Sequence, residues 1–398
     1  MAPLPLEGVR VIDAATVIAG PGTAARLGDF GADVIKVEHP RGDTVRSLGW
    51  KALGSDSTLW WKQIGRNKRP ITLNLSTQKG QDLLLRLVET ADVLIESFRP
   101  GTFERWGLGP DAAFERNARL ILLRTSGFGQ TGPYRRRPGF GTLAEAMSGF
   151  AHMTGFPDGP PVLPPIALAD EVAAALGAFA VMVALYHRDA GGGHGQVIDL
   201  SLVEALFSCI GPVPAVYHML GIVPGRLGNR IAYAAPRGAF RCKDGRWVAL
   251  SGTSQAVAER IFRAMGRSEL ASDPRFVTNA DRVANADALD DLIGRWIGER
   301  TCEEVLAAFD REQVAAAPVY DIAEAEADPQ FLDRGTVVRV TDEELGDVPM
   351  CDVQPRLSET PGRIRHAGRS LGASNGEVFE ELGLDREELE RLRAEGVI

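Results

Sequence analysis

The first 130 residues alternate between short apolar segments and segments with helical periodicity, and this alternation limits the folds open to the chain. The sequence predicts strands at 9–13, 33–37, 69–75, 92–96 and 120–125, and helices at 22–31 and 78–89. In the second helix Leu83, Leu87 and Val88 fall on one side, as in an amphipathic helix that packs on a sheet. Strands that alternate with helices through short links form parallel sheets. We therefore expect an α/β fold built on a parallel sheet.

The chain beyond residue 126 continues this pattern and then changes. Residues 126–141 are rich in Gly, Pro and Arg and predict a long loop, and long ordered loops are often functional. The sequence then predicts a helix at 170–189, a strand at 196–200, a helix at 203–220, a hairpin at 240–251 that turns at Lys243-Asp244-Gly245, helices at 255–265, 288–298 and 301–310, a polar linker at 357–375 and a last helix at 377–395. We expect a large domain at 1–224, a smaller α+β domain at 225–329, and a C-terminal segment at 330–398 that returns to the large domain.

The charges are unevenly spread along the chain. The sequence holds 44 basic and 53 acidic residues, and this net charge of −9 argues against a nucleic-acid-binding protein. Residues 1–140 carry 20 basic and 14 acidic residues, a net charge of +6, whereas the remainder carries −15. Either the surface composition drifts, or the N-terminal third binds a small anion with several phosphates. The cations in presumed loops after strands are Arg41, Arg46, Arg66, Lys68, Arg69, Arg99, Arg105 and the triplet Arg135-Arg136-Arg137.

Cysteine spacing and hydropathy predict a cytoplasmic protein without a membrane span. The four cysteines are too sparse for a disulfide framework or a zinc motif, so we expect reduced thiols. The N-terminal segment MAPLPLEGVRVID lacks the apolar run of a signal peptide. The longest apolar stretch, 172–186, has 15 residues, and a membrane span needs about 20. The six histidines are scattered, and we expect no metal site.

A glycine pattern follows the first predicted strand. Gly20-Pro21-Gly22 begins a G-x-G-x-x-A match, with Glu38 after the next strand, as in dinucleotide-binding folds. The match is imperfect because six residues separate Asp13 from Gly20 and because Pro21 removes one N–H. Three interpretations remain open: a dinucleotide site, a tight turn into a helix, and a helix N-terminus that approaches another anionic ligand.

Asp170 opens the predicted apolar helix at 170–189. One interpretation is an ordinary N-cap or first-turn carboxylate, which the helix dipole and the unpaired N–H groups favour. The same setting suits a nucleophile, since the positive helix end keeps the carboxylate ionised while apolar neighbours leave it poorly solvated.

Several segments, taken in order, carry a family resemblance. They include VRVIDAATVIAGPGTAARLGDFGADVIKVEHPRGDTVR, NKRPITLNL, ADVLIESFRPGTFERWGLGP, SGFGQTGPYRRRPGFG, TGFPDGPPVLPPIALADEVAAALGAFAVMVALYHRDAGGGHGQVIDLSL, AAPRGAFRCKDGRWVALSG and HAGRSLGASNGEVFEELGL. Together they resemble the class III coenzyme A-transferase family, also called the CaiB/BaiF family. The resemblance implies a Rossmann-like large domain, a smaller domain and a homodimer of interlocked rings. It makes the Gly20–Gly22 segment a wall of a coenzyme A pocket.

The resemblance also implies a reaction and its residues. The family nucleophile falls on Asp170, which would attack an acyl-CoA thioester and carry covalent intermediates until a carboxylic acid takes the CoA. Bound CoA must be kept from water, because hydrolysis would waste either intermediate. Coenzyme A is then a substrate, and no permanently bound cofactor is expected. The CoA contacts carried over by position are Val17, Ile18, His39, Arg41, Leu73, Ser97, Arg105 and Arg137, with Arg135 or Arg136 as replacements for the last.

The chain departs from relatives at three places. Racemases of the family carry Gly-His-Asp where this chain has Gly139-Phe140-Gly141, so the two-base proton transfer lacks an imidazole. Some transferases have an acidic residue at the position of Gly141, and its absence predicts extra room for an acyl group. The glycine loop of formyl-CoA transferases is not evident near 234–252, which disfavours formyl or oxalyl groups.

We therefore expect a transferase that moves CoA between an acyl-CoA, such as succinyl-CoA or another dicarboxylyl-CoA, and a carboxylic acid. The arginine-rich loop motivates the dicarboxylate, because a second carboxylate needs a cation. An acyl-CoA racemase, a nicotinamide-dependent oxidoreductase and a non-catalytic CoA-binding paralogue remain as alternatives.

Overall fold

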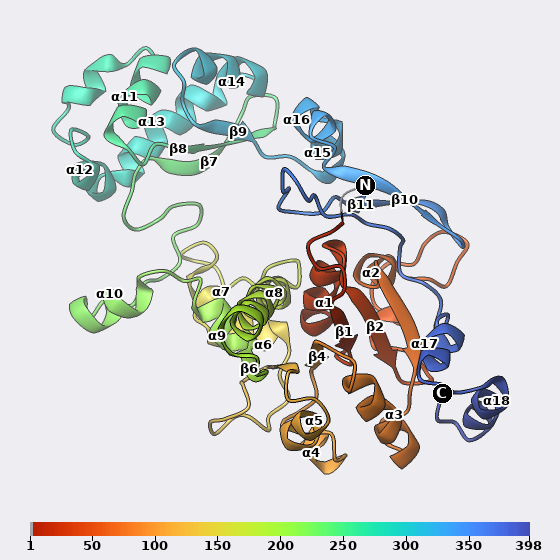
Figure 1. Cartoon of the computed structure of the whole chain (residues 1–398). Coiled ribbons are helices and arrows are strands. Elements are labelled where there is room, and N and C mark those ends of the chain that lie inside the picture. Colours follow the sequence, from red (N-terminus) through yellow and green to blue (C-terminus); the bar gives the residue numbers. More distant parts are fainter. Residues whose placement is uncertain (1–2) are drawn as a thin grey trace. The chain divides into compact units, whose positions relative to one another are not determined.

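The computed structural model describes residues 3–398 and divides into two compact units (Figure 1). Met1 and Ala2, which belong to the predicted large domain, lie outside the described residues. The first unit comprises residues 1–150, 164–211 and 333–398, and the second comprises 151–163 and 212–332. The sequence analysis placed the domain boundaries at 225 and 330, whereas the second unit runs from 212 to 332. Residues 151–163, which were expected in the large domain, group with the second unit.

A six-stranded parallel sheet forms the centre of the first unit. Its strands, in the spatial order β3-β2-β1-β4-β5-β6, are β1 (Arg10–Asp13), β2 (Asp33–Glu38), β3 (Lys68–Thr72), β4 (Val93–Glu96), β5 (Ile121–Ser126) and β6 (Gln196–Ser201). Every neighbouring pair is parallel, which confirms the predicted α/β fold. Since parallel strands end at the same edge, the loops after β1, β4 and β5 meet there.

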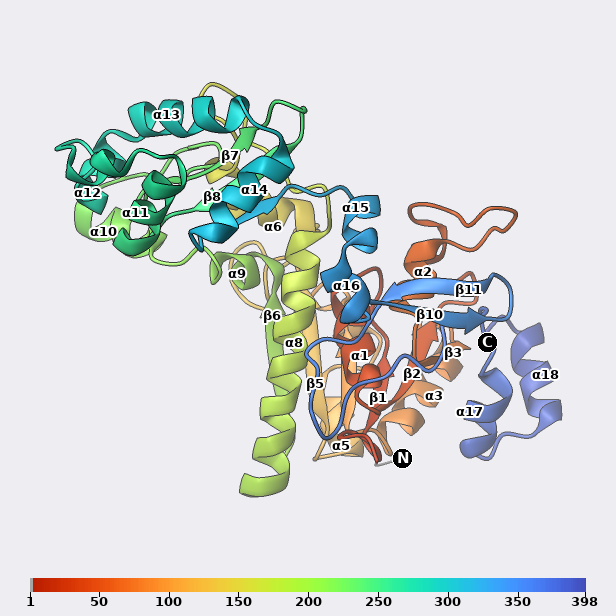
Figure 2. The ribbon, with the colours of Figure 1, turned by 90° about the horizontal axis from the view of Figure 1, so that it is seen from above.

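Helices cover both faces of this sheet, as Figures 1 and 2 show. The helices of the first unit are α1 (Ala19–Asp29), η1 (Thr44–Ser47), α2 (Leu59–Ile64), α3 (Gln78–Val88), α4 (Thr102–Arg105), α5 (Pro110–Arg116), α6 (Gly141–Met147), α8 (Leu168–Tyr186), η2 (His187–Gly192), α9 (Leu202–Phe207), α17 (Asn375–Glu381) and α18 (Arg386–Ala394). Val11 enters the core with α1 and α8, whereas its neighbour Ile12 enters the core with α3, α17 and α18. Burial on both faces explains why successive residues such as Val11 and Ile12 are both apolar.

Two predicted helices are wrong because each is interrupted. The segment predicted at 203–220 forms α9 in the first unit and α10 (Val213–Leu220) in the second. Gly211, with a φ of 64°, and Pro212 separate them, since neither favours a helix interior. The segment predicted at 377–395 forms α17 and α18, which are separated at Gly383, where φ is 78°.

The second unit contains an antiparallel sheet of β7 (Arg237–Arg241), β8 (Trp247–Ser251) and β9 (Ala316–Pro318). The predicted hairpin and its turn near Gly245 are present. The remaining helices are α7 (Phe150–Met153), α11 (Gln255–Ala264), η3 (Ser268–Ser272), α12 (Asn279–Ala284), α13 (Ala286–Gly298), α14 (Cys302–Arg311), α15 (Ile322–Ala327) and α16 (Pro329–Asp333). A further hairpin, β10 (Val337–Asp342) with β11 (Gly346–Cys351), belongs to the first unit.

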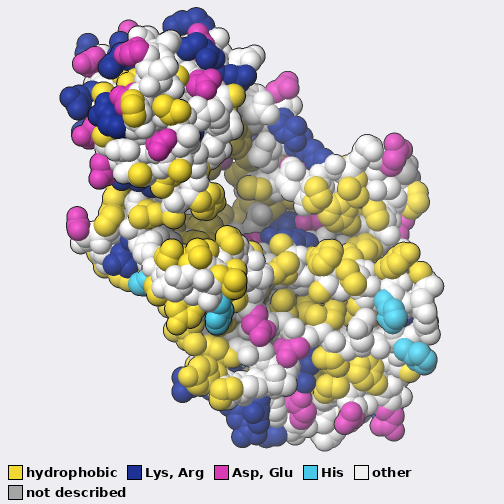
Figure 3. Space-filling view, turned by 90° about the vertical axis from the view of Figure 1, so that its left-hand side faces the viewer, with side chains coloured by type: hydrophobic (Ala, Val, Ile, Leu, Met, Phe, Trp, Pro, Cys, Tyr) yellow, Lys and Arg dark blue, Asp and Glu magenta, His cyan; other side chains and the backbone are white. Residues whose placement is uncertain are grey.

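Helix α8 continues directly into η2, and the joined run is longer than the helix predicted at 170–189. Among the described residues, the helical run Leu168–Gly192 has 25 residues and a mean hydropathy of 1.9, so length and composition alone would allow a membrane span. Water-soluble core helices pass the same test. One face of α8 packs on α1 through Ala174 and Gly177, while Phe179 and Tyr186 stay 67% and 77% exposed. Figure 3, which views the side where α8 and α9 lie in Figure 1, shows hydrophobic side chains spread over that surface.

Candidate active site

A pocket of about 230 Å³ that is open to solvent lies where the loops after β1, β4 and β5 meet the start of α8. Five of the nine predicted site residues line it: Val17, Ile18, Ser97, Arg137 and Asp170. Residues that the sequence analysis did not select also line it, among them Thr16, Phe98, Arg99 and Phe140. Arg99 had a signal in the sequence, since it is one of the cations that follow a strand.

The other four predicted residues lie outside this pocket. His39 and Arg41 follow β2, and Leu73 follows β3, so all three lie at the same edge of the sheet as the pocket. The side chain of Leu73 is buried in the core, and that of Arg105 in α4 donates to Thr102 Oγ1 at 2.9 Å. Burial and the charge of Arg41 lower the pKa of His39.

Asp170 lies in the first turn of α8 but does not cap it. The N-cap is Ala167, whose side chain offers no acceptor, so the interpretation of Asp170 as an N-cap is wrong. Burial, followed by the charges of Glu145 and Glu171, raises the pKa of Asp170 to about 6. We expected the helix end to keep the carboxylate ionised, and burial works against that effect. At pH 7 the group is still mostly ionised and also poorly solvated.

Gly141, the first residue of α6, leaves no extra room beside Asp170. A Cβ built on Gly141 would overlap Oδ2 of Asp170 and lie 3.0 Å from its Cγ. The sequence-based expectation of space for a larger acyl group is therefore wrong at this position, because the carboxylate itself fills that space. The neighbouring Phe140 lines the pocket and is 64% exposed.

Glu145 is an acidic residue of the site that the sequence analysis missed. It lies one helical turn after Gly141 in α6, is only 3% exposed, and accepts a hydrogen bond from the Ala169 N–H at 3.3 Å. Its charge is among the causes that raise the pKa of Asp170. In the sequence Glu145 is the one acidic residue in the otherwise uncharged stretch 138–157, and this isolation could have marked it. Its position beside Asp170 is evident only from the packing of α6 on α8.

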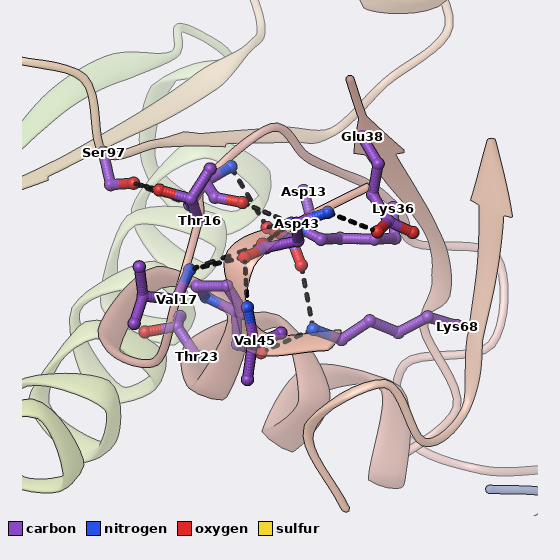
Figure 4. Close-up of polar contacts among 12 residues, drawn as sticks. Asp13, Thr16, Val17, Thr23, Lys36, Glu38, Asp43, Val45, Lys68 and Ser97 are labelled. Carbon is purple, nitrogen blue, oxygen red and sulfur yellow. Dashed lines mark hydrogen bonds and ion pairs between the residues drawn. The ribbon is translucent and has the colours of Figure 1, made fainter. Parts of the chain in front are cut away.

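The loop between β1 and α1 is held by side chains from two other loops (Figure 4). The Thr16 N–H donates to Ser97 Oγ at 2.8 Å, and the Val17 N–H donates to both carboxylate oxygens of Asp43 at 3.3 Å. Val17 has a φ of 67°, an uncommon conformation for a β-branched residue. Asp43 therefore supports a strained backbone in the wall of the pocket.

Buried charges lie beneath this loop (Figure 4). Asp13 is fully buried, and its carboxylate contacts Lys68 Nζ at 2.8 Å and Lys36 Nζ at 3.8 Å. Lys36 also pairs with Asp43 at 3.2 Å and donates to the Ala15 carbonyl. Burial lowers the pKa of Lys68 to about 8. For Lys36, the charges of Asp13 and Asp43 outweigh burial and raise the pKa. These pairs tie the pocket wall to β1, β2 and β3.

The candidate phosphate-binding cations separate into two groups. Four of them are engaged by carboxylates of the chain itself, namely Arg46 by Glu38, Arg66 by Asp29, Lys68 by Asp13, and Arg69 by Asp33 and Glu381. Among the residues described, the other six have no carboxylate partner: Arg41, Arg99, Arg105, Arg135, Arg136 and Arg137. Only this second group is available to bind an anionic ligand. The net positive charge of residues 1–140 is therefore only partly available for ligand binding.

The predicted loop contains no helix or strand from 127 to 140, and its two ends meet. A Cβ on Gly127 would lie 2.6 Å from the Gly139 Cα, so both positions require glycine. The Asp199 carboxylate accepts from the Gln130 N–H at 2.9–3.0 Å. The guanidinium of Arg137 lies 3.8 Å above the ring of Tyr134. Of the arginine triplet, Arg135 and Arg137 line the pocket, and Arg136 does not.

The Gly20-Pro21-Gly22 segment is the first turn of α1, and its glycines serve close packing. A Cβ on Gly20 would overlap the Ala15 side chain, and one on Gly22 would lie 2.9 Å from the Ala174 Cβ. The segment starts a helix, and Gly20 lines the pocket, so a ligand near this helix N-terminus stays a prediction. Among residues 3–398, no group of three or more potential metal ligands is found, and all four cysteines are free.

Comparison with known proteins gives one family. The family model described as CoA-transferase family III matches residues 6–375. The alpha subunit of succinyl-CoA–L-malate CoA-transferase from Chloroflexus aurantiacus is 42% identical over 99% of this chain and 93% of that protein. Succinyl-CoA–D-citramalate CoA-transferase from the same organism is 41% identical over 100% and 98%. The crystal structure of a CaiB/BaiF family protein from Brucella suis has a TM-score of 0.84 at 32% identity, covering 96% of this chain and 100% of that one.

Proposed function

Because the chain belongs to CoA-transferase family III and is a CoA-transferase, we propose that it moves CoA from succinyl-CoA or a similar dicarboxylyl-CoA to a second dicarboxylic acid. The observation that carries the proposal is the Asp170 carboxylate, partly desolvated in a pocket that Arg99, Arg135 and Arg137 also line. A carboxylate nucleophile and arginines without carboxylate partners are what a thioester with anionic groups requires.

In the proposed reaction each covalent step exchanges one leaving group for another. An Asp170 oxygen attacks the thioester carbonyl, the C–S bond breaks, and CoA thiolate leaves a mixed anhydride. The thiolate then attacks the Asp170 carbonyl carbon and releases the donor acid, which gives an aspartyl-CoA thioester. The acceptor carboxylate attacks this thioester, and the returning thiolate attacks the acceptor acyl carbon, which forms the new acyl-CoA and frees Asp170.

The CoA contacts follow from where each residue lies. Val17, Ile18 and Ser97 line the pocket beside Asp170 and are proposed to contact the part of CoA near the thioester. The strand order β3-β2-β1-β4-β5-β6 supports the proposal of a Rossmann-like domain, and such folds bind ligands at the carboxyl edge where the order reverses. The residues proposed for the more distant parts of CoA are His39, Arg41, Leu73 and Arg105, with Arg99 and Arg137 nearer the pocket. CoA acts as a substrate and is not a permanently bound cofactor.

The dicarboxylate preference rests on charge and on the relatives. Two relatives are named as succinyl-CoA transferases with malate or citramalate as acceptor. In this chain Arg99, Arg135 and Arg137 line the pocket without a carboxylate partner, and a bidentate guanidinium suits a second carboxylate. A site built to pair a charged group discriminates strongly against analogues that lack it.

A panel of acyl-CoA donors against carboxylic acids, followed by mass spectrometry, tests the proposal. We expect succinyl-CoA with malate-like or citramalate-like acceptors to exchange CoA at least about tenfold faster than acetyl-CoA with monocarboxylic acids, since a lost ion pair costs about 1.4 kcal/mol or more. A preference for monocarboxylic pairs would contradict the dicarboxylate assignment, and absence of any exchange would favour the non-catalytic alternative.

The alternative enzymes have less support in the pocket. No histidine occurs among the described residues that line it, so a racemase would have Asp170 as its only evident base. Gly20 and Gly22 allow close packing against Ala15 and Ala174. They therefore do not form the phosphate-binding turn that the dinucleotide pattern requires. We therefore place transfer ahead of racemisation and of nicotinamide-dependent oxidation.

We propose that the protein self-associates as an interlocked homodimer in the cytoplasm. The exposed apolar side chains of α8 and α9, including Phe179, Val183, Tyr186 and Phe207, are the motivation, because monomers rarely expose such faces. Sedimentation velocity is expected to show a species of twice the chain mass. A monomer would contradict this proposal. The next partner to test would then be a second kind of chain, because one relative is named as an alpha subunit.

A further inference from the structure

Two carboxylates converge on the N-terminus of α8. Asp170 occupies its first turn, and Glu145 reaches the same turn from α6. The Glu145 carboxylate accepts a hydrogen bond from the N–H of Ala169, the residue directly before Asp170. Because Ala167 cannot cap the helix, Glu145 supplies a cap from another helix.

Asp170 lines the pocket, and Glu145 lies behind the pocket lining. The space beside Gly141 is filled by Oδ2 of Asp170, and Asp170 lines the pocket, whereas Glu145 does not. Glu145 is 3% exposed, so water screens its charge poorly. Two like charges held close in a poorly screened site repel each other, and the repulsion ends when one of them loses its charge.

Other charged groups around α8 are differently placed. They are Arg26 on α1, which pairs with Glu171 at 2.6 Å, Glu204 on α9, Arg124 on β5, Asp199 on β6, and Arg99, Arg135 and Arg137 at the pocket. The charge of Glu171 is offset by Arg26, and Glu204 is exposed. Of the two carboxylates that act on Asp170, Glu145 is the buried one, and within residues 3–398 it has no cationic partner.

We propose that Glu145 is a positioning residue for CoA transfer, whose buried negative charge directs the Asp170 carboxylate into the pocket and makes it a stronger nucleophile. This inference rests on the proposed role of Asp170. Acylation turns the anionic Asp170 into a neutral anhydride or thioester, so the repulsion from Glu145 is present before the attack and absent after it. Glu145 thus favours formation of both covalent intermediates without touching the substrate.

The test compares the pH dependence of kcat in the wild type and in Glu145→Gln. Glutamine keeps an oxygen acceptor for the Ala169 N–H and removes only the charge. In the wild type, activity should fall as the pH drops through about 6, where Asp170 becomes protonated. In E145Q this acidic limb should move down by about half to one pH unit, and kcat at pH 8 should fall about three- to tenfold with an unchanged KM for acyl-CoA.

Two further variants separate charge from structure. Glu145→Asp keeps the charge and should keep the acidic limb near the wild-type position, and it carries the test if E145Q folds poorly. Glu204→Gln makes the same chemical change at an exposed position of α9 and should leave the acidic limb of the pH profile unchanged. An unmoved limb in E145Q, or a limb that moves equally in E145D, overturns the inference while the transferase assignment stands. A wild type without transfer activity overturns the assignment instead.

Discussion

Asp170→Asn is expected to lower kcat for CoA transfer by at least about a thousandfold, because the amide is neutral and cannot attack a thioester. Asparagine has almost the same shape as aspartate, so it should fill the space beside Gly141 that the carboxylate occupies. Incubation of wild type with acyl-CoA and hydroxylamine should convert residue 170 to a hydroxamate that peptide mass spectrometry detects. The variant should yield none.

The control for this loss is binding and stability. Since the variant keeps the pocket walls and removes a buried negative charge, CoA should bind at least as tightly, and the melting temperature should not fall. Transfer at an undiminished rate in D170N would show that another group is the nucleophile. The position of the hydroxamate would identify that group, and Glu145 and Glu171 are the alternative carboxylates beside Asp170.

Asp13→Asn is expected to lower the free energy of unfolding by about 3–5 kcal/mol, the usual effect of breaking a buried ion pair from one side. Asp13 is fully buried and faces Lys68 and Lys36, which are themselves 0% and 1% exposed. The neutral amide leaves Lys68 without a carboxylate at 2.8 Å and weakens the tie between β1 and β3. Urea unfolding followed by circular dichroism measures the change.

Asp56→Asn is the matched control, because Asp56 pairs with Lys51 at 2.7 Å while its side chain is fully exposed. Solvent-exposed pairs contribute little, so this variant should unfold at the wild-type urea concentration. If D13N and D56N unfold alike, the buried charges would not hold the sheet together. The loop at Val17 would then need another explanation for its strained conformation.

The sheet could be predicted from sequence because its residues carry the pattern locally. Val11 and Ile12 enter cores on opposite faces, so neighbouring residues of the strand are both apolar, and the short links to helices predict parallel strands. The interruption at Gly211 and Pro212 was also local, yet the apolar residues on either side continue a helical pattern that hid it.

The site was only partly predictable because its details depend on tertiary contacts. Arg69 pairs with Asp33 and with Glu381, and Glu381 lies more than 300 residues away in the sequence. Among the described residues Arg99 has no carboxylate partner, and no local sequence pattern distinguishes these two arginines. The role of Glu145 depends in the same way on the packing of α6 against α8. Family resemblance pointed to Asp170 as a candidate, but it gave no indication that Glu145 lies beside it.

The close approach of Gly127 and Gly139 has a practical consequence for protein engineering. The two ends of the loop, Gly127 and Gly139, lie side by side, so the segment between them is a cassette, a stretch that can be exchanged while its ends stay in place. Its length and sequence can vary without displacing β5 or α6, because loop closure costs little more as a loop grows. Because Arg135 and Arg137 in this segment line the pocket, we expect its exchange between relatives to change which acids the proposed reaction accepts.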